Sequence, residues 1–537
     1  MSERRRKFWG WGYEDDPVST EELTWFENAW AKHLGIAQFD VTPAPRMEEI
    51  TLRSPRIAIP TSLRDICTTE KWDRLFHTYG RSGAEMARAM LREFSNPPDV
   101  VAYPHNETDI INILDWCNSM DAAAIPFGGG SSVVGGVEPT RDERYCGTVT
   151  ISLRNFNRVL EIDKTSQSAR IQAGVLGPSL EAQLKPSGLT LRFFLQAWEF
   201  SSLGGWIATR AAGHYATLYT HIDDHVQSLR VVTPSGVLES RRLPASGAGP
   251  SPDRMFIGSE GTLGIITEAW VRLHRRPTFR AATTVRFKDF YQAADAVRAI
   301  TQAGLYPANC RLVEAAEAAF TEAGDGKHDL LVLSFESGDH PLEPWMKRAL
   351  ELCADYGGAY DKDALTRKDS QRSGAAGAWR NKFLRGPYFR EHQIARGVMR
   401  DTVETAITWD RFKDLHANVT AAGLRAIKDV TGRDGSFTCR FTHVYPDGPA
   451  PYFTWHAFGD KAKLPEQFLA IRALASDAMA ASGGTITHHH AVGRVHRRWY
   501  DKQRPELFAK ALGAAKQALD PKFILNPGVL MDPAGRT

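Results

Sequence analysis

The pattern of hydrophobic and polar positions predicts helices first and then a strand–helix–strand unit. Residues 19–35 and 83–94 are predicted as helices, the first with Ser19 or Thr20 as its cap and Gly35 as its stop. Residues 100–103 form a short apolar run, a helix that Asn106 can cap follows, and residues 123–127 form a second apolar run. A glycine-rich loop comes directly after this unit.

Beyond the loop the apolar positions recur with a period of two. Short strands are predicted at residues 147–153, 158–163 and 169–175, and again from 228 to about 277, with turn residues between them. Longer helices and strands follow to about residue 500, including a helix over 465–484 with one apolar stripe. The last helix, 505–521, precedes a tail that we expect to pack back on an earlier domain. The chain is therefore predicted to be α+β.

A chain of 537 residues is too long for one hydrophobic core. We divide it into an N-terminal helical region at 1–95, two domains at 96–277 and 278–505, and a C-terminal segment at 506–537. Its 66 Lys and Arg against 63 Asp and Glu are spread without a basic block, so charge does not suggest nucleic acid as a partner and favours a small molecule.

The cysteines and the apolar runs indicate the compartment. Six scattered cysteines without a CxxC pair fit a reducing environment, and we expect no disulfides. No apolar run reaches the ~18 residues that a membrane span needs. The sequence predicts a cytoplasmic protein and leaves peripheral membrane contact open.

The loop "PFGGGSSVVGG" at 126–136 holds five glycines in nine positions from 128 to 136. Glycine allows close backbone approach, so consecutive N–H groups can converge on an anion such as a pyrophosphate. A Rossmann loop would run directly into a helix, but this one runs into a turn-rich segment and then a strand. A flexible surface turn is the alternative, and the buried character of the preceding strand disfavours it.

Three consecutive histidines, 488–490, lie in "GGTITHHHAVGRVH". In an extended segment His488 and His490 would point to one face and His489 to the other, so a row of this kind is not by itself a metal cage. The alternative to a functional role is a polar strand end in solvent.

Three blocks in order, "IPFGGGSSVVGG", "SSLGGWIATRAAG" and "GSEGTLGIITEA", resemble the flavin-binding domain of the vanillyl-alcohol oxidase and p-cresol methylhydroxylase superfamily. Within it, "KFWGWGYEDD", "CRLVEAAEA" and "GGTITHHHAVGRVHRRW" are similar to the alkyldihydroxyacetonephosphate synthases. The resemblance implies bound FAD, a two-subdomain FAD-binding PCMH-type domain, an α+β cap (substrate) domain with helical terminal segments, and a homodimer. It also implies a redox-neutral exchange of the acyl group of an acyl-dihydroxyacetone phosphate for a long-chain alcohol.

The resemblance assigns residues by their matching motifs. The cofactor-binding set it implies is Pro126, Gly128, Gly129, Gly130, Ser131, Ser132, Ser202, Gly204, Gly205, Thr209, Glu260, Gly261, Thr262, Gly264 and Ile266. The catalytic set it implies is Arg311, Arg390, Tyr452, His488, His489 and His490. Arginine suits the substrate phosphate, and a phenol or imidazole suits removal of the proton beside the ketone.

Other functions remain open at this stage. The chain has "LQAWEFSS" where the family usually has a Pro-Asp-Ser segment, which alters the second flavin stretch. His443 with part of the histidine row could hold a divalent metal, as in related flavin dehydrogenases, although we assign no metal site. An FAD-dependent dehydrogenase or oxidase of a 2-hydroxy acid or alcohol is therefore the alternative function, and a purely structural flavin is a third.

Overall fold

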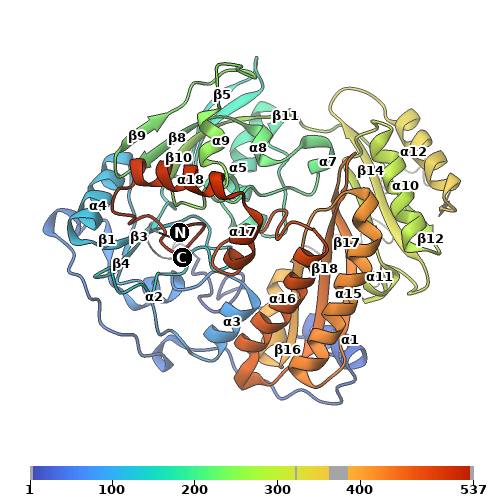
Figure 1. Ribbon diagram of the computed structural model, residues 1–537, viewed down its shortest axis with the longest axis horizontal. Helices are drawn as coiled ribbons and strands as arrows, with labels where there is room; N and C mark the ends of the chain where they lie inside the picture. Colours follow the sequence, from blue (N-terminus) through green and yellow to red (C-terminus); the bar gives the residue numbers. More distant parts are fainter. Residues whose placement is uncertain (1–3, 321–322, 362–384, 533–537) are drawn as a thin grey trace.

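The computed structural model describes residues 4–320, 323–361 and 385–532. Figure 1 shows two lobes side by side, a first lobe drawn in blue to green and a second drawn mainly in yellow to orange. Each lobe has its own large cluster of buried apolar side chains. Two sizeable cores are what a chain of this length requires, because a single core stops growing beyond roughly 250–300 residues.

The first lobe contains two main sheets and a short two-stranded one. The four-stranded sheet has the order β1-β2-β4-β3, with strands Cys67–Thr68, Val100–Ala102, Thr148–Ser152 and Ala123–Phe127. The five-stranded sheet has the order β5-β6-β10-β8-β9, with strands Val159–Asp163, Ser168–Gln172, Ile265–Arg272, Val226–Thr233 and Gly236–Glu239. Strands β7 (Leu189–Thr190) and β11 (His274–Arg275) pair beside them.

The helices of this lobe are mostly short. They are α2 (Lys71–Phe76), α4 (Glu107–Met120), α5 (Gly177–Leu184), α6 (Leu203–Ala208), α7 (Ala216–Tyr219), α8 (Ile222–His225) and α9 (Pro252–Phe256). Helix α3 (Gly83–Met90) packs instead on α14 (Arg390–Ala395) and α16 (Leu464–Ala481) of the second lobe. Helix α4 joins β2 to β3, and both strands run parallel to β4, which lies between them.

The second lobe is built on a seven-stranded antiparallel sheet. Its order is β15-β12-β14-β13-β17-β18-β16, with strands Ala359–Tyr360, Phe279–Phe287, Asp329–Ser337, Asn309–Val313, Ser436–Val444, Pro449–Phe458 and Val398–Glu404. Its helices are α10 (Phe290–Gln302), α11 (Ala315–Phe320), α12 (Glu343–Asp355), α14 (Arg390–Ala395), α15 (Trp409–Thr431) and α16 (Leu464–Ala481). Helices α15 and α16 pack on each other and against β18 and β16 (Figure 1).

Most of the local structure expected from the sequence is confirmed. Helix α1 spans Thr20–Leu34, with Ser19 accepting the N–H of Glu22 and Gly35 in the left-handed region. Asn106 caps α4 as expected. The helix expected to end at residue 94 ends earlier, at Met90, because Arg92 has a φ of 66° and so leaves the helical region.

The C-terminal segment crosses back onto the first lobe. Helix α17 (Arg497–Gln503) leads into α18 (Glu506–Leu519). Beyond α18, Ala124 donates its N–H to Ile524 at 2.8 Å, and the Asn526 side chain donates to the Gly136 carbonyl at 3.0 Å. The tail therefore lies against the strand that precedes the glycine loop and against the end of the loop itself.

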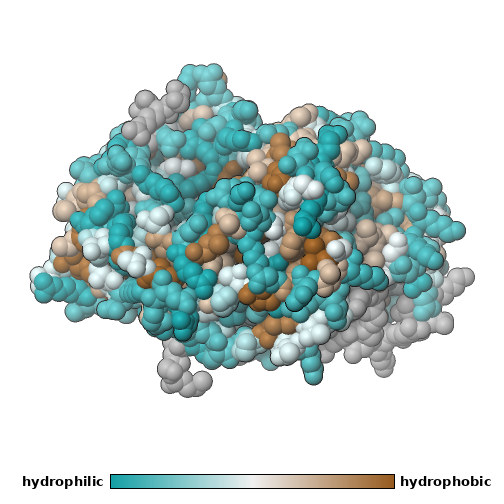
Figure 2. Space-filling model, turned by 90° about the horizontal axis from the view of Figure 1, so that it is seen from below, coloured by the Kyte–Doolittle hydropathy of each residue, from teal (hydrophilic) through white to brown (hydrophobic). Residues whose placement is uncertain are grey.

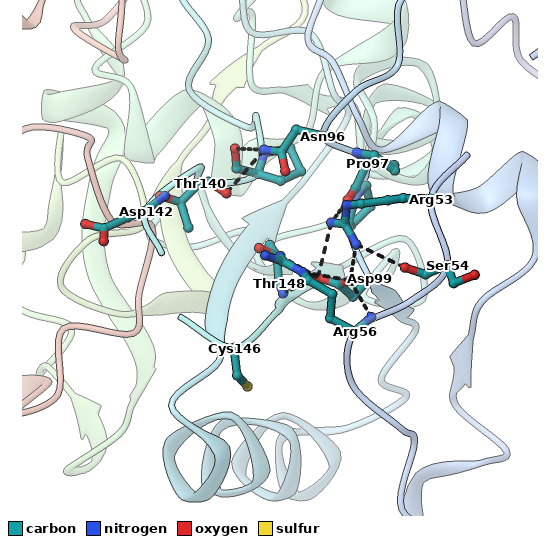
Figure 3. Close-up of polar contacts among 12 residues, drawn as sticks. Arg53, Ser54, Arg56, Asn96, Pro97, Asp99, Thr140, Asp142, Cys146 and Thr148 are labelled. Atoms are coloured by element: carbon teal, nitrogen blue, oxygen red, sulfur yellow. Dashed lines mark hydrogen bonds and ion pairs between the residues drawn. The ribbon is translucent and has the colours of Figure 1, made fainter. Parts of the chain in front are cut away.

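A buried carboxylate fastens the N-terminal arm to the first sheet (Figure 3). The Asp99 side chain is fully buried and accepts hydrogen bonds from the Thr148 N–H at 2.8 Å and from the side chains of Arg53 and Arg56. Burial alone would raise the pKa of Asp99, but the hydrogen bonds from Arg56 and Arg53 outweigh it and lower the pKa to about 2. The carboxylate is thus stabilised in its charged form.

We expect Asp99→Ala to lower the free energy of unfolding by about 3 kcal/mol, because it removes the anion from a buried ion pair. The Asp99 contribution is present above the unfolded pKa of about 3.9 and is lost as the pH falls toward about 2, so the variant should lack that part of the acid sensitivity. Urea unfolding at pH 7 and at pH 3 measures both effects. Asp142→Ala, which removes a partly exposed ion pair with Arg144, should cost under about 1 kcal/mol and serves as control.

The described part of the chain contains no membrane-spanning helix, and one face of its surface is mainly hydrophilic. None of the described helices is long and apolar enough to cross a membrane. Figure 2 shows the lower face, which is mainly hydrophilic, with apolar side chains gathered near its centre.

Candidate active site

A cavity of about 280 Å³ brings together segments from both lobes. From the first lobe it is lined by residues of the glycine loop and by parts of segments 201–214 and 260–266. From the second lobe it is lined by Arg311, by parts of 386–402 and 440–452, and by the region of the histidine row. The three blocks of the sequence that resemble a flavin domain therefore meet in space, opposite the catalytic set.

Nineteen of the twenty-one residues assigned from the sequence line this cavity. They are Pro126, Gly128, Gly129, Gly130, Ser131, Ser132, Ser202, Gly204, Gly205, Thr209, Glu260, Gly261, Gly264, Ile266, Arg311, Arg390, Tyr452, His489 and His490. The other two lie beside it. The buried Thr262 hydroxyl donates to the Ser259 carbonyl, and His488 lies behind His489. The altered segment at Leu195, Gln196 and Ala197 also lines the cavity.

The glycine loop is packed too closely for side chains. A Cβ at Gly129 would lie 1.9 Å from the Phe200 carbonyl oxygen, and one at Gly128 would lie 2.2 Å from Ser202 Oγ. Gly130 has a φ of 70°, in the left-handed region. Among the described residues, no protein acceptor receives the N–H of Gly129, Gly130 or Ser131. A cradle of free N–H groups lining a cavity fits the pyrophosphate of FAD.

Glu260 links the first lobe to the loop that follows the histidines. Its carboxylate accepts the N–H of Val492 at 2.9 Å and that of Gly493 at 2.8 Å. Burial raises the pKa of Glu260 to about 7, against the two hydrogen bonds, which lower it. The residue lines the cavity and at the same time fastens the loop after the histidine row to the first lobe.

Arginines dominate the second-lobe wall. Arg311 on β13 donates from Nη2 to His214 Nδ1 at 3.0 Å, and burial, followed by the neighbouring Arg440, lowers its pKa to about 9. Arg440 on β17 pairs with the buried Glu317, and its guanidinium lies 4.2 Å from the centre of the Tyr452 ring. Such a buried cationic wall favours an anionic ligand.

Arg390 and Arg400 complete this wall. Arg390 begins α14, donates to the Arg400 carbonyl oxygen and lies 3.5 Å from Asp401. Asp401 in turn pairs with Arg472 of α16 at 2.8 Å. Arg400 itself lies on β16 opposite His456 and also lines the cavity.

The histidine row is not an extended strand, so the expected alternation of faces is wrong. Residues 488–490 form bends, and all three N–H groups converge on one carboxylate. Glu404 accepts them at 2.7 Å from His488, 3.3 Å from His489 and 3.1 Å from His490. Burial would raise the pKa of Glu404, but His490, His488 and these hydrogen bonds hold the pKa below its ordinary value. An anion that collects three N–H groups explains how adjacent imidazoles can face one region.

The imidazoles are joined in a hydrogen-bonded chain that leads away from the cavity. His489 Nδ1 lies 3.0 Å from His488 Nδ1, and His488 Nε2 lies 2.8 Å from the Tyr445 hydroxyl, which also contacts His221. Burial lowers the pKa of both His488 and His489 well below the ordinary value, with the neighbouring histidine as the next cause. Both rings are therefore neutral at pH 7 and can accept a proton.

His443, His488 and His489 place one nitrogen each within 4.8 Å of one another, a geometry that could hold a metal ion. Both nitrogens of His443 are already engaged, because Nε2 donates to the Gly213 carbonyl at 2.8 Å and Nδ1 lies 3.1 Å from the Thr442 hydroxyl. Metal binding would have to break one of these contacts.

Tyr452 lies in the second-lobe wall between Arg440 and His489. It sits on β18 directly opposite Glu404, and its ring stacks on that of His489 with centroids 5.9 Å apart. Within the described residues its hydroxyl has no hydrogen-bond partner, and the residue lines the cavity. A phenol beside a guanidinium and a neutral imidazole is suited to proton transfer.

Several residues of the site were missed in the sequence. They are Arg81, His214, His221, Arg400, Asp401, Glu404, Arg440 and Tyr445. Some signal was present, since Arg400, Asp401 and Glu404 are charged residues interspersed with apolar ones in the segment that forms β16, and unpaired charge is costly when it is buried. Which partner each one finds depends on the pairing of β16 with β18.

Comparison with known proteins agrees with this geometry. Residues 98–240 match the family described as FAD binding domain, and residues 276–530 match the family described as FAD linked oxidases, C-terminal domain. The chain is 29% identical to the alkyldihydroxyacetonephosphate synthase of Dictyostelium discoideum, covering 97% of this chain and 85% of that relative. A solved alkyldihydroxyacetonephosphate synthase superposes with a TM-score of 0.80 at 26% identity, covering 97% of this chain and 98% of that one.

A more distant relative is the probable mitochondrial D-lactate dehydrogenase of Danio rerio, 27% identical over 81% of this chain and 85% of that relative. The alkyldihydroxyacetonephosphate synthases thus match more of the chain than the dehydrogenase does. The resemblance inferred from the motifs is confirmed, and so are the α+β fold and FAD as the cofactor. The chain is an FAD-dependent enzyme that carries an FAD binding domain and an FAD linked oxidase C-terminal domain, and it is a homologue of the alkyldihydroxyacetonephosphate synthases.

Proposed function

We propose that the protein is an alkyldihydroxyacetonephosphate synthase, which exchanges the acyl group of acyl-dihydroxyacetone phosphate for a long-chain alcohol. The carbon–oxygen bond to the fatty acid breaks, a new one to the alcohol forms, and the fatty acid leaves with no net oxidation. The observation that supports it most directly is one cavity that joins a pyrophosphate-type glycine loop to a wall of arginines beside neutral histidines.

Each part of the cavity takes one task in this proposal. The residues that line it from the three glycine-containing stretches would hold FAD, whose bound isoalloxazine supplies an electrophilic centre for the substrate carbon. Arginines of the second-lobe wall, Arg311 among them, hold the phosphate. Tyr452 and His489 move the proton beside the substrate ketone, and the chain through His488 and Tyr445 carries it away from the cavity.

The second candidate is a metal-assisted dehydrogenase of a 2-hydroxy acid. The arrangement of His443, His488 and His489 favours it, because three imidazoles that can converge on one point are typical metal ligands. The hydrogen bonds of both His443 nitrogens count against it.

An anaerobic assay separates the two functions. The yellow holoenzyme with palmitoyl-dihydroxyacetone phosphate and hexadecanol should release palmitate and form the alkyl ether in equal amounts, with the flavin still oxidised at the end. EDTA should have no effect. Bleaching by D-lactate without ether formation, lost on chelation and restored by Zn²⁺ or Mn²⁺, would instead establish the dehydrogenase.

The proposal includes the domain division at residues 95, 277 and 505, a homodimer and peripheral contact with a membrane. The new sheet that begins at Phe279 supports the second boundary. The apolar side chains on the lower face (Figure 2) support contact with a membrane, where a long-chain alcohol would be dissolved. Light scattering and sedimentation with anionic vesicles measure these two properties.

A further inference from the structure

Among the described residues, Arg400 is a cation with no carboxylate partner. It lies on β16 and lines the cavity, and no described carboxylate lies within ion-pair distance of it. Its Nε is buried and has no hydrogen-bond partner among the described residues. A guanidinium stays charged at any physiological pH, so burying one unpaired is unfavourable unless a ligand supplies the counter-charge.

Three neighbouring arginines, in contrast to Arg400, have carboxylate partners in the protein. Arg440 has its partner in Glu317, and Arg472 has its partner in Asp401 at 2.8 Å. Arg390 lies 3.5 Å from the same Asp401 and donates one N–H to the Arg400 carbonyl oxygen. These three are held by protein groups, and Arg390 additionally fixes the backbone that carries Arg400.

The charge balance of the cavity indicates what the missing anion is. Five arginine and two carboxylate side chains line it within the described residues, so a positive excess remains even after the two charges of the FAD pyrophosphate at the glycine loop. Burial and then Arg390 lower the pKa of Arg400 to about 10, so the residue is still charged at pH 7. A phosphate dianion offers the charge and the paired oxygens that a guanidinium fork fits.

We propose that Arg400 is the principal ligand of the substrate phosphate and that Arg390 acts mainly by positioning it. This inference deepens the proposed function and rests on it for the identity of the substrate. In this proposal the group that distinguishes a phosphate ester from a monocarboxylate lies on β16. It does not lie at the start of α14.

Calorimetric titration of the oxidised holoenzyme with dihydroxyacetone phosphate tests this without turnover. We expect Arg400→Gln to weaken binding at least 30-fold with unchanged FAD content. Arg400→Lys, which keeps the charge without the fork, should recover part of the loss and also serves if the Gln variant fails to fold. Arg390→Gln should weaken binding less than Arg400→Gln. The control is Arg425→Gln on the exposed face of α15, which should bind as the wild type does.

The outcomes separate the inference from the function. Wild-type affinity in both Arg400 variants would overturn the inference, as would loss of FAD from a folded variant, because Arg400 would then serve the cofactor. A wild-type protein that makes no ether, yet binds dihydroxyacetone phosphate in an Arg400-dependent way, would refute the proposed function alone. Ether formation by Arg400→Gln at the wild-type KM would refute the inference alone.

Discussion

Tyr452→Phe and His489→Ala are each expected to keep FAD and to lose roughly 100-fold in turnover, the usual scale of general acid–base catalysis. The two rings stack on each other and line the cavity, and the Tyr452 hydroxyl has no described protein partner to occupy it. His489 can pass a proton to His488, whose Nδ1 lies 3.0 Å away. Single-turnover ether formation with the two variants measures the loss.

The pH dependence of kcat/KM should show which protonation state of His489 is active. Burial, followed by the neighbouring His490, lowers the pKa of His489 well below its ordinary value. The neutral base is therefore present above that lowered pKa and is lost only as the pH falls through it. Wild-type kcat/KM should show no loss that depends on His489 as the pH falls through about 6.5, where an exposed histidine would already be titrating.

A matched control is His340→Ala, since His340 is about half exposed on the second lobe, away from the cavity. It should turn over as the wild type does. Equal activity of Tyr452→Phe and wild type would remove Tyr452 from the chemistry. Chelator-sensitive activity with stoichiometric metal would move the histidines to the metal-binding role of the dehydrogenase.

The sequence was most informative where function depends on local backbone. The glycine loop could be recognised because close packing excludes side chains there, as Gly129 against the Phe200 carbonyl shows. The strand–helix–strand unit could be recognised from its apolar runs and from Asn106, which caps α4 in the structure. These features depend on residues close together in the chain.

The sequence was least informative where function depends on register between distant strands. Nothing local indicates that Glu404 would lie opposite Tyr452, 48 positions later, or that its carboxylate would collect the N–H groups of the histidine row. The expected alternation of the row failed for this reason. The prediction assumed that the segment is locally extended. In the fold, the carboxylate of Glu404, from a strand distant in the chain, accepts its N–H groups and bends it.

The same limit applies to the arginines. The motifs assigned both Arg311 and Arg390 to the site. Only the ion pairs of the folded protein show that Arg390 pairs with Asp401, while Arg400 has no described carboxylate beside it. Charge partners are set by the fold, so a sequence can nominate cationic residues without ranking them.

Glu404→Gln is expected to lose on the order of 100-fold in kcat although Glu404 does not line the cavity. Its carboxylate accepts three consecutive N–H groups and the Thr487 hydroxyl, and its side chain is about 1% exposed. An amide turns one acceptor into a donor that faces other donors, which costs about 3 kcal/mol at a buried site. Residues 488–490 should therefore lose the bent conformation in which His489 lines the cavity.

Three measurements show whether Glu404 acts by positioning the row or only by stabilising the fold. The variant should keep FAD, bind dihydroxyacetone phosphate as the wild type does and lose kcat, since the described contacts of the Glu404 carboxylate are with residues 487–490 and not with the arginines. Glu181→Gln is the matched control, because Glu181 is a buried carboxylate of the first lobe that accepts the Leu191 N–H at 3.0 Å and pairs with Arg276. It should melt earlier than the wild type and still turn over normally. If Glu404→Gln melts no earlier than Glu181→Gln but is far slower, its carboxylate positions the catalytic histidines; if the two variants are equally active, Glu404 only stabilises the fold.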